Sequence, residues 1–377
     1  MSKSIRSIAS HSHETSVAAA ELLAQLDAFE PAVIAFFAAH THDGALIARL
    51  LRRRFPEAQV IGCSTAGEFS ERATLNGGVT GLALSSSKVA RAAARLVRFD
   101  VEGVDSGIRG AAASLAAELK MGSLREADPD RYVGIVLFDG INGREEEANE
   151  VLGNIAPMLS FVGGSAGDGL EFKATKVYCN DVESDNGAAL LLIDSAVAFT
   201  VMKTCSFVPA EQLFQVTRAD VKNRVVYELD GEPILDAYAK ALGYGPEEID
   251  ADVFMSHPVG LMIDGQPWVR SPAKVLPDGG VRFFCNIAVG MEISLMNSTD
   301  LVDDTRGALA RAQESLGAPI SGGLAFNCVL RRLEMDAKDL HGDFLQSFDG
   351  MQVGGFHTYG ETWLGHINQT LTAVWFA

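Results

Sequence analysis

Residues 353–361 read VGGFHTYGE and combine two adjacent glycines with a histidine, a threonine, a tyrosine and a carboxylate. A copy lies far upstream: residues 60–68 read VIGCSTAGE, and both stretches fit the pattern G-x-x-T-x-G-E. A looser copy, VGGSAGD, occupies residues 162–168. Glycines at this spacing let a backbone turn tightly or approach another group closely. Plain turns are the simpler interpretation, but the repetition predicts one structural device at strand ends, with one or more copies lining a site.

The predicted elements around the first two copies occur in the same order. Each copy is preceded by a helix, a short apolar strand and a second helix, and it is followed by a pair of strands. We interpret residues 1–205 as a duplicated α/β unit. The first set covers 14–29, 32–39, 44–55 and 59–63, with 79–85 and 89–99 as a hairpin pair; the second covers 105–120, 132–138, 144–158, 161–168, 188–193 and 196–203.

A second domain is predicted for residues 206–377. Its pattern indicates a strand over 253–263, broken at 257–258, then a strand meander, a helix over 300–316 and a strand over 319–329. The last copy of the glycine motif and a strand over 371–376 follow. The fold class predicted from these patterns is α/β (α+β), with two lobes of mixed β-sheets flanked by helices and an internal duplication in the N-terminal lobe.

Charge and composition restrict the class of partner. The chain has 377 residues and a formal net charge of −18, which argues against nucleic acid and anionic membrane surfaces and suits a basic protein partner. Five scattered cysteines are typical of reduced, intracellular thiols. No apolar run is long enough to span a bilayer, and residues 1–16 lack a signal-peptide core. The sequence predicts a cytoplasmic protein; a homo-oligomer is left open.

Three kinds of chemistry are open to the conspicuous side chains. Cys63 and Cys328 could act as nucleophiles, but neither has a base close in sequence. His257 lies in an apolar segment, either as a core residue or as the single axial metal ligand of a haem. Arg270 and Arg331 follow strands, where a guanidinium suits a carboxylate or phosphate ligand or an ion pair.

Five stretches together resemble one known family. They are GCSTAGE at 62–68, FVGGSAGD at 161–168, HPVGL at 257–261 with WVRS at 268–271, FNCVLR at 326–331, and GFHTYGE at 355–361 followed by NQTLT at 368–372. In this order they are similar to the FIST sensory domain family, with an N-terminal part over 1–205 and a C-terminal part over 206–377.

The resemblance implies a sensor of small ligands and not an enzyme. Some stand-alone bacterial members bind haem, sense nitric oxide and act on a partner histidine kinase, and family members have been proposed to bind amino acids. We therefore expect a haem-based nitric oxide sensor with His257 on the iron; the alternative is a receptor for an amino acid or another polar metabolite. The candidate contact residues are Cys63, Thr65, His257, Arg270, Cys328, Arg331, His357, Thr358, Tyr359 and Glu361.

Overall fold

A computed structural model describes residues 4–377 and divides them into two compact units. Unit 1 contains the described residues up to Thr204 together with Thr305–His366 and Leu371–Ala377. Unit 2 contains Cys205–Asp304 and the short segment Ile367–Thr370. This division differs from the predicted one into residues 1–205 and 206–377, because residues 305–366 pack with the N-terminal segment.

Unit 1 is built from three copies of one α/β repeat. Each copy runs strand, helix, strand, helix, strand, two-stranded hairpin and strand. Repeat 1 consists of β1 (Ile5–Ser10), α1 (Thr15–Gln25), β2 (Pro31–Ala39), α2 (Gly44–Arg54), β3 (Gln59–Thr65), the hairpin β4 (Glu68–Ser70) and β5 (Thr74–Leu75), and β6 (Val79–Ser85). The predicted elements of this region are therefore confirmed up to β3.

Repeats 2 and 3 follow the same order with small additions. Repeat 2 consists of β7 (Val89–Arg98), α3 (Phe99–Glu102), α4 (Val104–Glu118), β8 (Tyr132–Phe138), α5 (Glu145–Ile155), β9 (Phe161–Ser165), β10 (Val177–Cys179), β11 (Val182–Ser184) and β12 (Gly187–Ser195). Repeat 3 consists of β13 (Phe199–Cys205), α8 (Leu301–Leu316), β22 (Gly322–Cys328), α9 (Val329–Lys338), α10 (His341–Gln346), β23 (Gln352–Thr358), β24 (Glu361–Trp363), β25 (His366–Ile367) and β26 (Thr370–Phe376). The sequence of unit 2 interrupts repeat 3 between β13 and α8.

The two-stranded hairpin of each repeat pairs with the sheet of another repeat. The sheets have the orders β1-β6-β2-β3-β10-β11, β7-β12-β8-β9-β24-β25 and β13-β26-β22-β23-β4-β5. In each, two parallel strands joined by a crossover helix lie beside antiparallel neighbours. Repeat 1 receives the hairpin of repeat 2, repeat 2 that of repeat 3, and repeat 3 that of repeat 1. The exchange is closed, so no repeat has a complete sheet by itself.

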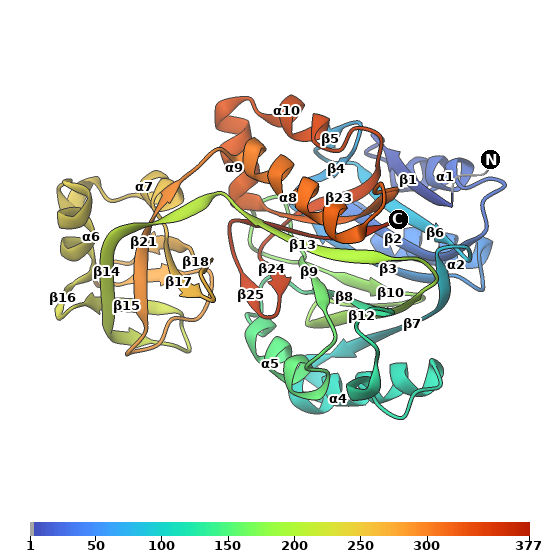
Figure 1. Ribbon diagram of the computed structural model, residues 1–377, viewed down its shortest axis with the longest axis horizontal. Helices are drawn as coiled ribbons and strands as arrows, with labels where there is room; N and C mark the ends of the chain where they lie inside the picture. Colours follow the sequence, from blue (N-terminus) through green and yellow to red (C-terminus); the bar gives the residue numbers. More distant parts are fainter. Residues whose placement is uncertain (1–3) are drawn as a thin grey trace. The chain divides into compact units, whose positions relative to one another are not determined.

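One apolar core lies between the three sheets, and the helices cover their outer faces. The run PAVIAFFAA of β2 is apolar throughout because both faces of this strand are buried. Phe37 faces the shared core with residues from all three repeats, such as Phe356, whose ring centroid lies 4.6 Å away. Phe36, one position earlier, faces α1 and α2 instead. Figure 1 shows these helices in blue, α4 and α5 in green, and α8 and α9 in orange, all outside the strands.

Unit 2 is an antiparallel sheet with short helices and its own core. Tyr238, Phe254 and Phe214 are among the buried residues of that core. The segment 367–370 is anchored here, because the Gln369 side chain bonds Ser271 Oγ (2.7 Å) and Met255 O (2.9 Å). The elements are β14 (Phe207–Asp220), β15 (Val225–Leu229), β16 (Glu232–Pro233), α6 (Ile234–Leu242), α7 (Ala251–Ser256), β17 (Val259–Ile263), β18 (Gln266–Arg270), β19 (Pro272–Val275), β20 (Val281–Phe283) and β21 (Glu292–Ser298).

The predicted fold class is confirmed, and two local predictions are wrong. The sheets are mixed and flanked by helices, as predicted. The segments 79–85 and 89–99 do not form a hairpin: β6 pairs with β1 and β2, whereas β7 pairs with β12 in another sheet. The predicted strand over 253–263 is helical at its start, because Asp250 caps α7 through the backbone N–H groups of Asp252 and Val253. His257 therefore follows a helix.

A substitution at Gly163 tests how closely the two parallel strands of repeat 2 pack against each other. A Cβ at this position would lie 1.8 Å from the carbonyl oxygen of Val136 on the neighbouring strand, so the backbones must separate in Gly163→Ala. We expect this variant to lose about 1–3 kcal/mol of unfolding free energy, measured by urea denaturation. Gly153→Ala in α5 is the matched control, since no heavy atom lies within 4 Å of its added methyl group. Equal midpoints for Gly163→Ala and the wild type would contradict the packing described.

Candidate functional site at the strand ends of unit 1

The three glycine motifs meet where the parallel strands of unit 1 end. Each motif spans the second parallel strand of its repeat and the chain crossing that leads from the end of this strand to the exchanged hairpin. Three main-chain hydrogen bonds link the motifs in a closed circle: Ala66 N to His357 O (3.3 Å), Tyr359 N to Ser165 O (3.1 Å) and Gly167 N to Ser64 O (3.0 Å). We call these linked motifs the strand-end ring. Ligands of α/β sheets commonly bind at such carboxyl ends.

Each repeat buries a hydroxyl–carboxyl pair at the ring. Thr65 Oγ1 donates to Glu68, and Thr358 Oγ1 donates to Glu361 in the equivalent positions of repeat 3. Both carboxyl groups are fully buried. In repeat 2, Ser165 Oγ lies 3.4 Å from a carboxyl oxygen of Glu145, which comes from α5 rather than from the motif. The ring therefore concentrates acidic side chains inside the protein, where charge is costly.

Glu68 responds most clearly to this burial. Loss of water raises its pKa to about 7, although the hydrogen bonds from Thr65 Oγ1 and Gly78 N and the charge of Arg332 act in the opposite direction. The group therefore changes protonation state near neutral pH. Arg332 also donates to Ala66 O (2.6 Å), so its guanidinium group lies against the turn of the first motif.

A chain of buried side chains fixes the protonation of His357. Arg331 Nε donates to Asn327 Oδ1 (2.8 Å), which leaves the Asn327 amide nitrogen to donate to His357 Nδ1 (3.0 Å). A ring nitrogen that accepts a hydrogen bond carries no proton, so the imidazole is neutral with its proton on Nε2. Burial lowers the pKa of His357 well below its usual value, and the charges of Arg332, His341 and Arg331 lower it further.

Tyr359 connects the ring to the loop between β9 and β10. Among the three described repeats, only repeat 2 has such a loop. The Tyr359 hydroxyl donates to Asp168 and accepts from Leu170 N (2.8 Å). The Asp168 carboxylate also accepts from three backbone N–H groups of the loop. Burial raises its pKa, but the hydrogen bond from Tyr359 and those from the three N–H groups together hold the pKa below the usual value. Phe172, half exposed, stacks on Tyr359 at 4.6 Å. Leu170 and Phe172 both have positive φ, so the loop is held in a strained conformation.

Eight of the ten predicted contact residues lie at or next to the strand-end ring. The group consists of Cys63, Thr65, Cys328, Arg331, His357, Thr358, Tyr359 and Glu361, all buried. Their role in ligand contact stays a prediction. The sequence reasoning missed Glu145 and Thr305, which bond Ser165 and Arg331 respectively. Glu145 stands in an acidic first helical turn, a pattern that helix dipoles explain by themselves.

Both candidate thiols are buried in the protein and are not exposed. Cys63 belongs to the core between the sheets, and burial, with the nearby Glu68 charge, raises the pKa of its thiol. Cys328 is buried at the start of α9. A thiol of raised pKa carries little thiolate and is a poor nucleophile at neutral pH.

His257 and Arg270 belong to unit 2. His257 follows α7, and its Nδ1 is a buried atom without a hydrogen-bond partner among the described residues. Its backbone oxygen accepts from the Tyr238 hydroxyl. Arg270 ends β18 opposite Val259. No group of three or more metal-ligating side chains occurs within residues 4–377. None of the helices in this range is long and apolar enough to cross a membrane.

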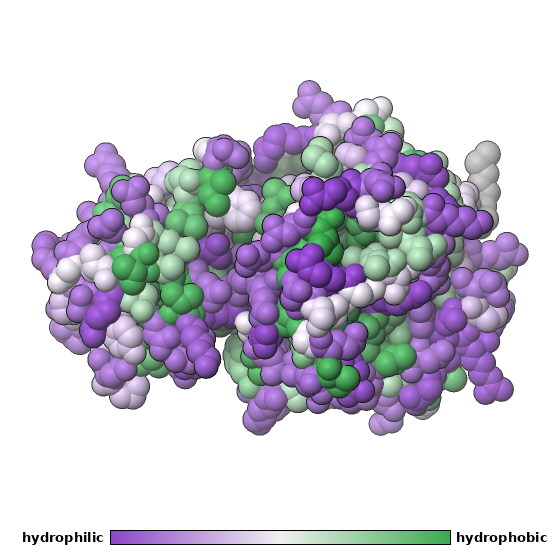
Figure 2. Space-filling view, turned by 90° about the horizontal axis from the view of Figure 1, so that it is seen from below, coloured by the Kyte–Doolittle hydropathy of each residue, from purple (hydrophilic) through white to green (hydrophobic). Residues whose placement is uncertain are grey.

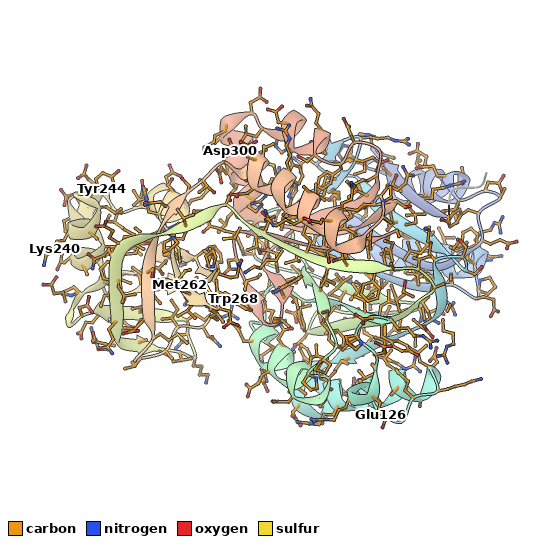
Figure 3. All side chains as sticks on the ribbon, in the orientation of Figure 1. Glu126, Lys240, Tyr244, Met262, Trp268 and Asp300 are labelled. Carbon is orange, nitrogen blue, oxygen red and sulfur yellow. The ribbon has the colours of Figure 1, made fainter. Side chains whose placement is uncertain are left out.

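The raised pKa of Glu68 predicts a pH-dependent stability. A carboxyl group whose pKa is higher in the folded state binds more protons there, so the unfolding free energy falls as pH rises from about 4.5 through 7. The shift corresponds to about 3 kcal/mol. We expect the unfolding free energy of Glu68→Gln, a neutral isostere, to increase relative to that of the wild type between about pH 4.5 and pH 7 and to level off above this range in urea titrations. Glu126→Gln, at the surface in Figure 3, is the control. A pH-independent difference would contradict the assignment.

Comparisons with known proteins agree with these motifs. Residues 32–232 match the FIST N domain and residues 235–363 match the FIST C domain. An uncharacterized protein of Methanocaldococcus jannaschii, MJ1623, is 26% identical over 267 residues, which is 66% of this chain and 50% of that protein. The chain thus spans about half the length of that relative. A cyanuric acid hydrolase structure aligns over 99% of both chains at 9% identity and a TM-score of 0.36, too low to support any argument. The chain belongs to the FIST family.

Proposed function

We propose that the protein senses a small polar ligand, which binds at the strand-end ring of unit 1. The domains of the FIST family are sensory, and their ligands are small molecules. The observation that carries the proposal is the meeting of three motifs, each from a different repeat, with a hydroxyl–carboxyl pair at each. A ligand held there would contact all three repeats, so its binding would change how the repeats are held together.

The side chains of the ring favour a ligand that carries hydrogen-bond donors. Glu68, Asp168 and Glu361 are buried acidic groups of the three motifs, and Glu145 adds a fourth. Carboxylates accept hydrogen bonds only, and their partners are N–H and O–H groups or cations. An amine, amidine or polyhydroxy compound therefore suits these carboxyl groups better than a simple anion does.

A sensor explains the site better than an enzyme does. Catalysis by a thiol needs a thiolate within reach of a base, whereas Cys63 is fully buried and the pKa of its thiol is raised. His357, the histidine within the third motif, is bonded through Nδ1 to an amide and not to a nucleophile. The buried polar groups are instead arranged as a network that a ligand could stabilise.

Ligand-dependent thermal stabilisation tests this proposal. Amines, amino acids and sugars are screened by differential scanning fluorimetry, and a true ligand at 100 times its Kd should add about 2.7 kcal/mol to the unfolding free energy. We expect Glu361→Gln to lose most of this increment, because the variant removes a ring carboxylate, whereas Glu126→Gln should keep it. The increment, not the baseline Tm, is compared, so a less stable variant remains informative. Equal increments in both variants would place binding elsewhere.

Haem at His257 is a second candidate, favoured by one observation. Nδ1 of His257 is buried and has no hydrogen-bond partner among the described residues, so the protein's own polar groups do not satisfy this nitrogen. On this proposal the imidazole of His257 would hold the iron of a haem. Bound haem would supply a coordination position for a diatomic gas such as nitric oxide. On this proposal the protein signals to a partner histidine kinase.

Absorption spectroscopy decides the haem proposal. Protein titrated with hemin, reduced and exposed to nitric oxide should show a Soret band that shifts with the gas, and His257→Ala should lose the band or alter it. His11→Ala, an exposed histidine, is the matched control and should behave as the wild type does. A colourless wild-type protein, or identical spectra for wild type and His257→Ala, would exclude haem at this residue.

A further inference from the structure

The hydroxyl–carboxyl pairs of the first and third motifs are closed to solvent, so a ligand can reach them only if a covering segment moves. All four of their side chains are at most 1% exposed. An apolar layer of Ala66, Val329 and Tyr359 lies at the ring, and Leu170 packs against this layer. Because Leu170 belongs to repeat 2, a segment of that repeat lies over residues of the other two. A ligand of the ring therefore needs a segment here that can open.

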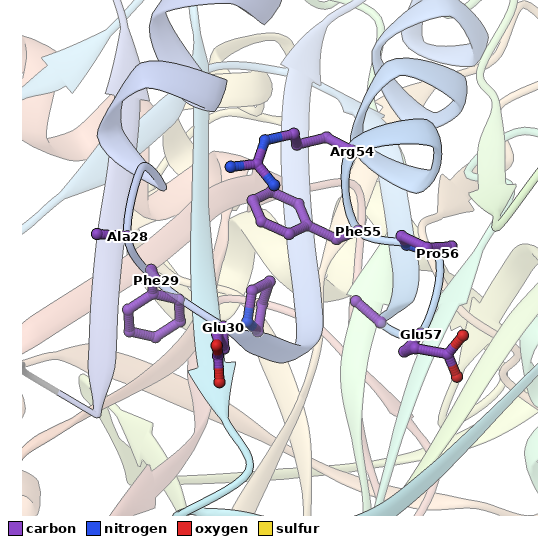
Figure 4. A pocket seen from close by; sticks show the side chains of 9 residues that line it. Ala28, Phe29, Glu30, Arg54, Phe55, Pro56 and Glu57 are labelled. Atoms are coloured by element: carbon purple, nitrogen blue, oxygen red, sulfur yellow. The ribbon is translucent and has the colours of Figure 1, made fainter.

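An open hollow of unit 1 lies too far from the ring to provide the entrance. It has a volume of about 560 Å³ and is lined by residues 28–31 and 54–58, at the starts of β2 and β3 (Figure 4). β2 runs from Pro31 in the hollow to Ala39, and β3 ends at Thr65 in the ring. The 9 residues of β2 span roughly 30 Å, so the hollow and the ring lie at opposite ends of the same parallel strands.

The chain crossing of repeat 2 is the longest of the three crossings at the ring. Residues 66–67 join β3 to β4, and residues 359–360 join β23 to β24. Neither of these short crossings can move far without unpairing the strands beside it. In repeat 2, residues 166–176 join β9 to β10. Movement at the ring without loss of sheet pairing is therefore expected in this loop.

Both ends of the loop are fixed to the first motif. Gly169 N donates to Thr65 O (3.2 Å), and Lys176 N donates to Ser64 Oγ (2.9 Å). Gly169 has a φ of 70°, in the left-handed region that glycine adopts readily, so the chain can turn directly after the first of these anchors. The part of the loop that can move as a unit is therefore the segment 170–173.

Tyr359 is the main contact that holds this segment down. Phe172 stacks on it, with ring centroids 4.6 Å apart and 19° between the ring planes, and Leu170 N donates to its hydroxyl (2.8 Å). A second contact, from Glu171 to His40 (3.7 Å), is exposed and contributes little. Phe172 is half exposed, so it covers Tyr359 from the solvent side. Hydrophilic side chains predominate on the molecular face in Figure 2, which sets such an aromatic stack apart from the surface seen there.

Asp168 lets a ligand replace what an open loop would lose. In the closed loop its carboxylate accepts from the N–H groups of Phe172 (2.9 Å), Lys173 (2.6 Å) and Ala174 (2.9 Å). Movement of the segment breaks the first two hydrogen bonds, while the Tyr359 hydroxyl still holds the carboxylate. N–H or O–H groups of a ligand can then take the freed acceptor positions. The donors that suit the ring thus also compensate the opening.

We propose that the loop between β9 and β10 is a lid over the strand-end ring, with the stack of Phe172 on Tyr359 as its latch. The proposal rests on the ligand site proposed above and adds how that site is controlled. A ligand enters when the segment 170–173 leaves Tyr359, and the lid closes over it afterwards, as lids that exclude water from a site do. Leu170 and Phe172 have positive φ, and opening relieves this strain.

The reaction of Cys328 with methyl methanethiosulfonate measures how often the lid opens. Cys328 is 1% exposed and lies opposite Thr358 in the pairing of β22 with β23, so its thiol lies at the ring. Phe172→Ala removes the stack and should raise the labelling rate of Cys328 about tenfold. Two controls should label within about twofold of the wild type: Phe172→Tyr, which keeps the stack, and Met158→Ala, at an exposed position of repeat 2. Cys179, buried in the shared core, reports unfolding of unit 1 and should label equally in all variants.

Hydrogen–deuterium exchange gives a second readout that does not depend on a thiol. The amides of residues 172–174, which bond Asp168 in the closed loop, should exchange faster in Phe172→Ala than in the wild type. Phe172→Tyr should leave their exchange unchanged. Because Phe172 is half exposed and stands in a loop, each variant should fold as the wild type does.

Two results would overturn the lid. Equal labelling of Cys328 in the wild type and Phe172→Ala would mean that the stack does not control access. Faster labelling of Cys328 and Cys179 together would mean that unit 1 unfolds and no lid opens. The labelling needs no ligand, so it separates this proposal from the proposed function. Stabilisation by a compound that depends on Glu361, with no effect of Phe172 on labelling, would refute the lid alone; a lid that opens, with no stabilising compound, would count against the ligand site alone.

Discussion

The exchange of hairpins between the three repeats is the constraint on which unit 1 depends. β3, β9 and β23 would each be an open sheet edge within their own repeat, with unpaired N–H and C=O groups. The hairpin of another repeat covers each edge, and the chain crossings that carry these hairpins are the glycine motifs themselves. A side chain at Gly163 would collide with Val136 O, so this glycine of the motif lets the parallel backbones of β8 and β9 pack closely. The close packing of the strands thus explains the repetition of the motif without any appeal to function.

Periodicity predicted most elements of the chain, but not all of their partners. The runs of β2, β8 and β22 are buried on both faces, so their type was readable, although the predicted strand over 319–329 is longer than β22. The partners of β6 and β7 could not be predicted, because two adjacent strands with alternating patterns suggest a hairpin. Only the tertiary structure shows that the two strands pair in different sheets. The third repeat was hidden by the sequence of unit 2, which stands between β13 and α8, although its motif matched the first without a gap.

The candidate site was predictable where its residues belong to a motif. Thr65, Thr358 and Glu361 stand in the repeated pattern, and the structure brings the three copies together. Glu145 comes from a helix whose acidic first turn looks ordinary, so no local signal sets it apart. The helix over 251–256 also escaped, because its cap, Asp250, precedes a segment with strand-like composition. Local patterns thus identified the elements, whereas contacts between distant repeats decide which side chains share a site.

The closed exchange also has a consequence for how the protein is made. During synthesis the first hairpin leaves the ribosome long before the strand it completes; Glu71, beside that hairpin, bonds the backbone of Val353, 282 positions later. The strand β26, made after all the others, lies between β13 and β22 in the third sheet. Contacts of such sequence separation form slowly, and exposed sheet edges invite aggregation meanwhile. The third sheet therefore cannot be completed before β26, the last of the described strands, has been made.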